Sequence, residues 1–249
     1  MRLTRIAVIT GASSGIGEAL ARALAERDWH CVLLARREDR LRTLAAELGA
    51  EYEICDVGDR SAVERAAAAI GARHPSVQLL VNNAGISARV GFLEIEPDQL
   101  EAVMRVNYFG SVWALRAFLP LLERSGSADV VNIVSVAGTV SSGRSGPYGA
   151  SKHAQLAFSR AVTAELGTRG ISVHTINPGL VETEGFPQRA VLQRPLVRRL
   201  VIEPEDVAGH VIRVLERGRR ETFVPGWYRV AGLMQVLVPG LVARVARRR

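Results

Sequence analysis

Tyr148 and Lys152 are the side chains of this sequence best suited to proton transfer. They lie four residues apart, so a helix through both would place the phenol and the ammonium on one face. An ammonium beside a phenol favours the phenolate and lowers the tyrosine pKa from its usual value of about 10. Ser135 follows the apolar run 130–134, which is typical of a buried strand. The three residues predict a site with Tyr148 as general acid or base.

Lys152 is the only lysine in a chain that holds 32 lysine and arginine residues. Arginine supplies the charge everywhere else, so one retained lysine indicates a need for an ammonium in particular. An ammonium is a compact charge with three donors on a flexible stem, whereas a guanidinium is planar. The Tyr-x-x-x-Lys spacing also arises by chance on helices, so the catalytic interpretation depends on the elements around it.

A strand, a glycine-rich turn and a helix open the sequence. Residues 5–10 are apolar and β-branched, as in a buried strand, and residues 16–27 show a helical pattern. Between them, Gly11, Gly15 and Gly17 follow the spacing G-x-x-x-G-x-G. Such glycines let the backbone approach a pyrophosphate, and the helix N-terminus offers N–H groups and its positive dipole end. This opening predicts a dinucleotide cofactor.

The second expected strand, residues 31–35, ends at Arg36 and Arg37. In NAD-binding folds an acidic residue at this place binds the ribose 2′-hydroxyl. Here no carboxylate ends the strand to repel a 2′-phosphate, and two guanidiniums are suited to bind one. We therefore expect NADP(H) in preference to NAD(H). The alternative is a solvated helix start, since Glu38 and Asp39 follow.

Strands and helices alternate along the rest of the chain. This order implies right-handed βαβ crossovers and one α/β domain over residues 1–249, with a doubly wound parallel sheet of about seven strands and helices on both faces. Further strands are expected over residues 52–55, 77–81, 128–134, 171–176 and 221–224, and helices over residues 41–48, 61–70, 97–122, 146–166 and 203–216.

Composition narrows the class of protein. The 249 residues are 48% hydrophobic and 23% charged, as in a globular enzyme. No apolar stretch reaches the roughly 18 residues of a membrane span, and no secretory signal is recognised at the N-terminus, so we expect a cytoplasmic protein. Cys31 and Cys55 are expected as buried free thiols. The five histidines show no metal-ligand spacing, so no metal is predicted.

Taken together, the motifs resemble the short-chain dehydrogenase/reductase family. Each is weak alone, but their combination in the family's order over about residues 5–183 is very specific. The resemblance implies a Rossmann-type fold and an NAD(P)-dependent oxidoreductase. The matching segments are residues 10–17 (TGASSGIG), 56–57 (DV), 82–85 (NNAG), the segment around Asn107, Ser135, residues 148–152 (YGASK) and residues 177–183 (NPGLVET).

The resemblance implies a role for each matching residue. Tyr148 would exchange a proton with the substrate oxygen, and Ser135 would bind the substrate carbonyl. Lys152 would lower the pKa of Tyr148 and bind the nicotinamide ribose. Asn107 would hold a water for a proton relay, unless it only caps or breaks a long helix. The expected cofactor contacts, besides Arg36, Arg37, Tyr148 and Lys152, are Gly11, Ser13, Ser14, Gly15, Ile16, Gly17, Asp56, Val57, Asn83, Ala84, Gly85, Pro178, Gly179, Val181 and Thr183.

The C-terminal quarter departs from the family pattern. Residues 1–184 hold 19 basic and 20 acidic side chains, whereas residues 185–249 hold 13 basic and 5 acidic. Residues 185–202 are expected to form a substrate lid or an ordinary amphipathic helix. The family often ends in a glycine-rich segment that helps tetramers pack; its absence here favours a homodimer over a tetramer. Residues 227–249 predict a basic amphipathic segment for a membrane surface or a subunit contact, interrupted at Pro239.

The leading prediction is an NADP(H)-dependent carbonyl reductase that interconverts a ketone and a secondary alcohol, on an apolar or lipid-like small molecule. We expect residues 227–249 to fold back beside the lid and form its hydrophobic rim. The alternative is a non-catalytic dinucleotide sensor or a binding protein that uses the basic C-terminus. The complete set of Ser135, Tyr148 and Lys152 argues against the sensor. The lack of base-stacking aromatics among the C-terminal arginines argues against nucleic acid.

Overall fold

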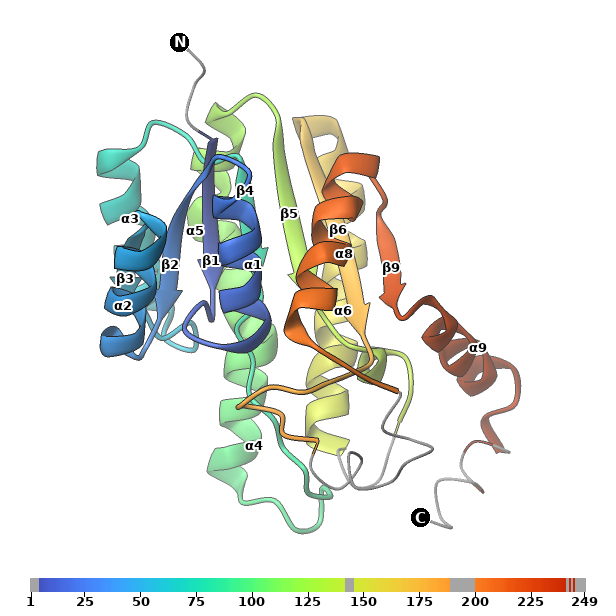
Figure 1. The fold of residues 1–249 in the computed structure, drawn as a ribbon. Helices are drawn as coiled ribbons and strands as arrows, with labels where there is room; N and C mark the ends of the chain where they lie inside the picture. Colours follow the sequence, from blue (N-terminus) through green and yellow to red (C-terminus); the bar gives the residue numbers. More distant parts are fainter. Residues whose placement is uncertain (1–4, 142–145, 189–199, 241, 243, 245–249) are drawn as a thin grey trace.

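A seven-stranded parallel sheet forms the centre of the protein, with the strand order β3-β2-β1-β4-β5-β6-β9 (Figure 1). The structure is a computed structural model that describes residues 5–141, 146–188, 200–240, 242 and 244. This sheet confirms the predicted fold class. Its strands are β1 (Arg5–Thr10), β2 (Trp29–Ala35), β3 (Glu51–Ile54), β4 (Leu79–Asn82), β5 (Ala128–Ile133), β6 (Ile171–Pro178) and β9 (Glu221–Val224).

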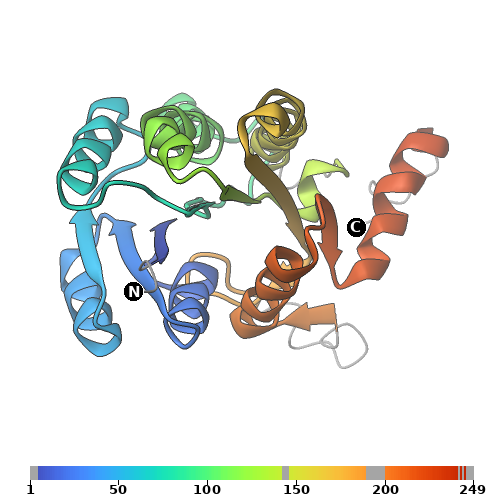
Figure 2. The ribbon, with the colours of Figure 1, turned by 90° about the horizontal axis from the view of Figure 1, so that it is seen from above.

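Helices cover both faces of the sheet. Helices α1, α2 and α8 pack on one face and α3, α5 and α6 on the other, as the view from above shows (Figure 2). Helix α9 lies outside these layers, beyond strand β9. The helices are α1 (Gly15–Ala25), α2 (Glu38–Leu48), α3 (Arg60–Arg73), α4 (Pro97–Met104), α5 (Gly110–Arg124), α6 (Gly146–Leu166), α8 (Pro204–Arg217) and α9 (Arg229–Leu237).

The apolar first strand is buried on both sides. Ala7 and Ile9 face the core under α1, α2 and α8, while Ile6 and Val8 face the core under α3, α5 and α6. Successive side chains of a strand point to opposite faces, so a sheet covered on both faces requires a continuous apolar run. Burial of each such large aliphatic side chain contributes about 1.5–3 kcal/mol.

The chain changes direction across the sheet between β1 and β4. From β1 it proceeds outward to β2 and β3, and it then returns to add β4 on the other side of β1. The loops that follow β1 and β4 therefore leave in opposite directions and open a crevice at the carboxyl ends of the strands. In open α/β sheets this switch point is where ligands bind.

Two features differ from the expected order of elements. The helix expected over 97–122 is interrupted by a π-helical turn, η1 (Arg105–Phe109), between α4 and α5. A small parallel sheet, β7 (Leu180–Val181) with β8 (Val201–Ile202), follows β6 and was not predicted. Short 3₁₀ turns are η2 (Val136–Gly138), η4 (Gly167–Arg169) and η6 (Gly226–Tyr228).

Parts of the expected C-terminal features lie outside the described residues. These are residues 189–199 of the expected lid, and residues 241, 243 and 245–249 of the basic segment. Helix α9 ends at Leu237, two residues before Pro239, as the sequence predicts. Within the described ranges, every helix is too short or too polar to cross a membrane.

Candidate active site

Nearly all of the predicted site residues line one cavity of ≈ 610 Å³ at the carboxyl ends of the central strands. This volume is in the range of small-molecule and cofactor sites. The lining includes Gly11, Ser13, Ser14, Gly15, Ile16, Arg36, Arg37, Asp56, Val57, Asn83, Ala84, Gly85, Ser135, Tyr148, Lys152, Pro178, Gly179, Val181 and Thr183. Gly17 and Asn107 do not line the cavity. Gly17 packs against Gly11 and Asn83, and Asn107 binds the backbone of Ile86, and these three partners do line it.

The glycine loop requires glycine at each of its three glycine positions, by backbone conformation or by lack of space for a Cβ. Gly11 and Gly15 have φ of 65° and 58°, which side-chain-bearing residues rarely adopt. A Cβ on Gly11 would lie 2.7 Å from the Cα of Ala84, and a Cβ on Gly17 would lie 2.5 Å from Nδ2 of Asn83. The Ser14 side chain makes no capping bond to α1. The first N–H groups of that helix are therefore open to an anion, which fits the pyrophosphate of a dinucleotide.

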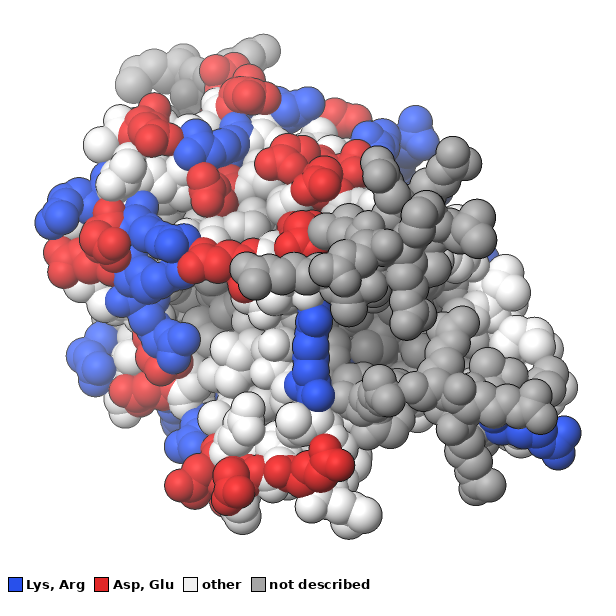
Figure 3. All heavy atoms as spheres, turned by 60° about the horizontal axis from the view of Figure 1, so that its bottom comes forward, with Lys and Arg blue, Asp and Glu red and all other residues white. Residues whose placement is uncertain are grey.

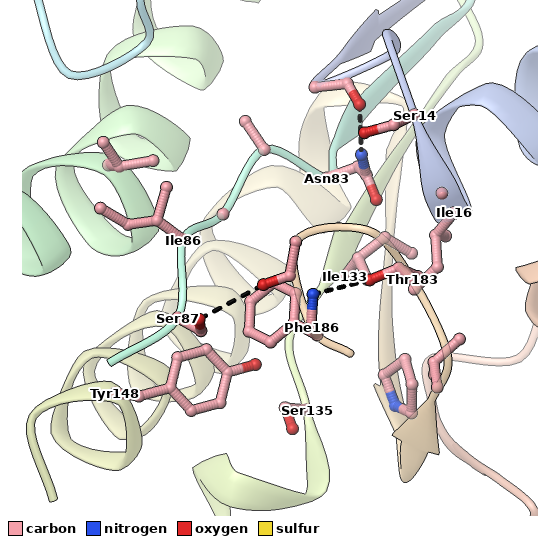
Figure 4. Close-up of a pocket in the computed structure, with 18 of the residues that line it drawn as sticks. Ser14, Ile16, Asn83, Ile86, Ser87, Ile133, Ser135, Tyr148, Thr183 and Phe186 are labelled. Carbon is pink, nitrogen blue, oxygen red and sulfur yellow. Dashed lines mark hydrogen bonds between the residues drawn. The ribbon is translucent and has the colours of Figure 1, made fainter. Parts of the chain in front are cut away.

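Asn83 and Thr10 fasten the loop after β4 to the glycine loop. Nδ2 of Asn83 donates to the carbonyl of Thr10 at 2.9 Å and to that of Gly11 at 3.2 Å. Figure 4 draws the second of these bonds. The hydroxyl of Thr10 accepts from the backbone N–H groups of Asn83 and Ala84 at 3.0 and 3.1 Å. The two segments that line the switch point are thereby held at a fixed separation.

Tyr148 and Ser135 face the same part of the cavity from different elements. Tyr148 is in the first turn of α6, and Ser135 follows β5 (Figure 4). Burial raises the pKa of Tyr148 to about 12, although the Ser135 hydroxyl partly offsets this increase. The phenol therefore keeps its proton at neutral pH and is suited to donate it to a substrate oxygen.

The ammonium of Lys152 has acceptors other than the phenol of Tyr148. Its Nζ donates to Oε1 of Gln155 at 2.7 Å and to the carbonyl of Ile133 at 3.1 Å, and it lies 5.9 Å from the Tyr148 ring centroid. Burial lowers the pKa of Lys152 to about 7. The expected decrease of the Tyr148 pKa is therefore wrong for this arrangement, because desolvation dominates and the ammonium pairs with other acceptors.

Asn107 occupies the π-helical turn and is completely buried. Its Oδ1 accepts from the N–H of Ile86 at 2.8 Å, and its Nδ2 donates to the carbonyl of Ile86 at 3.0 Å and to Oγ of Ser151 at 2.9 Å. π-turns are often found at functional sites. Here the turn lets one amide join the loop after β4 to α6. The relay role expected for Asn107 stays a prediction.

At the far end of the cavity, Arg37 and Arg36 have different partners. Arg37 donates to the hydroxyls of Ser13 and Ser14 in the glycine loop, at 3.0 and 2.6 Å. Arg36 lies 3.7 Å from Asp56 and is largely exposed. As expected, no carboxylate ends β2, but a carboxylate from a distant segment reaches this place. Glu184, from the segment after β7, binds Arg37 there, and local sequence around β2 could not reveal it.

The segment after β6 closes the cavity on its remaining side. The side chain of Thr183 packs against Gly15, and its Oγ1 accepts from the N–H of Phe186 at 3.1 Å. The ring of Phe186 lies 5.4 Å from that of Tyr148, centroid to centroid (Figure 4). The hydroxyl of Ser87 donates to the carbonyl of Gly185 at 3.3 Å. Phe186 and Ser87 were not predicted as site residues, and no local motif marks them.

A separate polar cluster lies at the opposite end of the sheet. Nε2 of His30 and Nε2 of His74 lie 2.9 and 3.0 Å from Oε1 of Glu51, and Arg73 donates to Oε2 of Glu51 at 2.7 Å. The side chains of His30, Glu51 and His74, which are all of types that bind metals, converge here, although their spacing in the sequence gave no sign of it. The cluster does not test the prediction that the protein binds no metal. Cys31 and Cys55 are buried free thiols, as expected.

Helix α9 lies next to the segment that follows Ser135. Gln235 accepts from the N–H of Ser141 at 3.3 Å, and Gly232 packs against Thr139. None of the residues of α9 is buried, and Val236 and Leu237 are 77% and 73% exposed.

On the face that carries the strands' carboxyl ends, visible acidic and basic side chains are interspersed (Figure 3).

The parallel sheet, the glycine loop and the shared cavity define a dinucleotide-binding oxidoreductase fold. The short chain dehydrogenase family model matches residues 5–190. The chain is 31% identical to dehydrogenase/reductase SDR family member 7B of Danio rerio, over 97% of this chain and 84% of the relative. The chain belongs to the short-chain dehydrogenase/reductase family and is an NAD(P)-dependent dehydrogenase or reductase.

Two solved structures show how far the likeness extends to cofactor-bound proteins. An alcohol dehydrogenase from the archaeon Thermococcus sibiricus, complexed with 5-hydroxy-NADP, is 30% identical with a TM-score of 0.79 over 88% of this chain and 95% of that one. A family member from Burkholderia phymatum in complex with NAD is 26% identical with a TM-score of 0.84 over 96% and 95%. Both cofactor types thus occur among similar proteins.

Proposed function

We propose that this protein is a carbonyl reductase that interconverts a ketone and a secondary alcohol, with NADP(H) as its cofactor. The observation that carries the proposal is the position of Ser135 and Tyr148 on the same cavity as the glycine loop. The bound nicotinamide supplies or accepts the hydride. Tyr148 then donates the proton to the oxygen that gains negative charge, and Ser135 holds that oxygen by a hydrogen bond. Burial raises the pKa of Tyr148 to about 12, so at neutral pH the phenol holds the proton that it would donate.

The preference for NADP(H) is supported by the guanidinium of Arg37. It lies between the glycine loop and the start of α2, where it already binds two serine hydroxyls. A 2′-phosphate at this place would gain charge-assisted hydrogen bonds. The ammonium of Lys152 has three donors, of which Gln155 and the carbonyl of Ile133 take two, so the third would bind the nicotinamide ribose.

The proposed substrate is apolar. Ile86, Val136 and Phe186 line the cavity close to Tyr148, and the exposed apolar residues of α9 lie beyond the η2 segment. A long acyl or lipid-like chain would extend from the carbonyl site toward α9. The proposed homodimer, the peripheral membrane contact and the cytoplasmic location stay predictions.

The test is the oxidation of NADPH in the presence of a series of aliphatic and aryl ketones. We expect turnover with NADPH, a higher kcat/KM for NADPH than for NADH, and a higher kcat/KM for longer apolar ketones. A higher kcat/KM with NADH would refute the cofactor preference. If no ketone or secondary alcohol is converted with either cofactor, the proposed reaction is wrong.

A further inference from the structure

Glu184 occupies an arginine cluster beside the glycine loop of the cofactor cavity. Its Oε1 and Oε2 accept from Nη1 of Arg37 at 3.2 and 3.1 Å. Arg40, one turn along α2, donates from Nη1 to Oε2 and from Nη2 to Oε1, the latter at 3.2 Å. Each guanidinium thus meets both oxygens of the carboxylate. Arg40 uses two nitrogens for the two oxygens, which is the forked manner in which arginines bind phosphate groups.

Arg37 joins this cluster to the glycine loop. Its Nε and Nη2 donate to Oγ of Ser13 at 3.2 and 3.0 Å, and Nη2 also donates to Oγ of Ser14 at 2.6 Å. The cluster therefore combines two guanidiniums with two hydroxyls, and of these groups Arg37, Ser13 and Ser14 line the cofactor cavity. It is an anion site, and in this structure its anion is a side chain of the same protein.

The backbone on which Glu184 stands is held in place. The N–H of Phe186 donates to the carbonyl and to Oγ1 of Thr183, both at 3.1 Å, which closes a tight turn around Glu184. The hydroxyl of Ser87 fixes the carbonyl of Gly185, and Phe186 packs on Tyr148. The carboxylate of Glu184 therefore projects from a turn whose backbone is held by hydrogen bonds to Thr183 and Ser87.

We propose that Glu184 stands in the place of the 2′-phosphate and competes with it, so that Glu184 determines how strongly the protein discriminates between NADP(H) and NAD(H). The proposal rests on the proposed binding of the 2′-phosphate by Arg37. A phosphate monoester carries almost two negative charges at neutral pH, so it cannot share the two guanidiniums with a carboxylate without strong repulsion. NADP(H) must displace Glu184 in order to bind. NAD(H), which lacks the 2′-phosphate, leaves the ion pairs of Glu184 intact.

The decisive variant is Glu184→Gln, which keeps the size of the side chain and removes its charge. Dissociation constants are measured by titration calorimetry at one ionic strength, for NADPH and NADH and for the fragments 2′,5′-ADP and 5′-AMP. Exposed ion pairs are weak, so we expect 2′,5′-ADP and NADPH to bind about two- to fivefold more tightly. The affinity for 5′-AMP and NADH should not increase.

Glu38→Gln is the matched control, because Glu38 carries the same charge in the first turn of α2 and is exposed. It should change none of the four affinities. Unchanged or weaker binding of 2′,5′-ADP to Glu184→Gln would overturn the proposal, as would an equal gain in Glu38→Gln.

Arg37→Ala separates this proposal from the proposed cofactor preference. If Arg37→Ala weakens 2′,5′-ADP but not 5′-AMP, Arg37 binds the 2′-phosphate, and the result for Glu184→Gln then decides the competition alone. If Arg37→Ala leaves 2′,5′-ADP unaffected, the phosphate is bound elsewhere. Both the argument for NADP(H) and the competition would then be wrong.

Discussion

Nζ of Lys152 donates a 2.7 Å hydrogen bond to Oε1 of Gln155, three residues farther along α6. Gln155 is completely buried and is itself fixed, because its Nε2 donates to Oγ of Ser111 at 2.9 Å. A hydrogen bond to the charged form of a group opposes the effect of burial on its pKa. Gln155 is thus placed to position the ammonium and to keep Lys152 charged near neutral pH, where burial has lowered its pKa to about 7.

Gln155→Leu should therefore shift the pH dependence of catalysis. Without this acceptor the pKa of Lys152 decreases further, and the lysine loses its charge at a lower pH. If catalysis requires the ammonium, the decrease of kcat/KM with rising pH moves to lower pH. Gln155→Glu should move it to higher pH, because a carboxylate stabilises the ammonium. Profiles measured from pH 5 to 10 that coincide for the three proteins would exclude this role for Gln155.

Tyr148→Phe should reduce turnover by about 10²- to 10⁴-fold, since it removes the proton donor. Binding of NADPH should persist, because the glycine loop that receives the pyrophosphate is unchanged. Steady-state rates and a fluorescence titration of NADPH measure the two effects separately. Near-normal turnover would show that another group supplies the proton.

The chemistry of the site could be predicted because it depends on residue types at fixed spacings. A phosphate loop requires glycines with positive φ, and Gly11 and Gly15 have them. The pairing of Glu184 with Arg37 could not be predicted, because the two are separated by 147 residues and meet through the turn after β7. Sequence patterns report local structure, whereas such a pair depends on how distant loops pack.

Burial also limited what the sequence could indicate about pKa values. The spacing of Tyr148 and Lys152 suggested an attraction between ammonium and phenolate. In the structure Lys152 is buried and Tyr148 is half-buried at the cavity, and desolvation is the largest influence on the pKa of each. Likewise, one continuous helix was predicted over residues 97–122. The π-helical turn at Asn107 was missed, and the partners of the Asn107 amide come from the distant loop after β4 and from α6.

Removal of residues 230–249 should weaken the selection of long ketones. In wild type each additional buried CH₂ should increase kcat/KM up to about fourfold, which corresponds to about 0.8 kcal/mol. The truncated protein should treat short ketones as wild type does and lose much of the increase with chain length. A parallel dependence on chain length in both proteins would mean that α9 does not contact the substrate.

Both ring nitrogens of His174 lie at hydrogen-bond distance from an acceptor: Nδ1 is 2.7 Å from the carbonyl oxygen of Arg219, and Nε2 is 2.8 Å from Oδ1 of Asp129. A carbonyl and a carboxylate only accept hydrogen bonds, so this geometry favours the imidazolium form of the buried ring. Burial alone would lower the pKa of His174, but the bonds to Asp129 and Arg219 outweigh it and raise the pKa above 6.5. This cation joins β5, β6 and the residues before β9.

The raised pKa of His174 predicts a loss of stability as the pH increases. The folded protein binds this proton more tightly than the unfolded chain, so its stabilisation is complete below pH 6.5 and is lost as the pH rises through the folded-state pKa. Asp129→Asn should decrease the free energy of unfolding by about 1–3 kcal/mol at pH 5.5 and by less at pH 9. Urea unfolding of the variant and of wild type across this pH range measures the difference in the free energy of unfolding. Because Lys152 is present in both proteins, its own pH-dependent contribution cancels in this difference. Asp98→Asn, at an exposed position, is the control. An equal loss for Asp129→Asn at both pH values would mean that His174 is neutral in the folded protein.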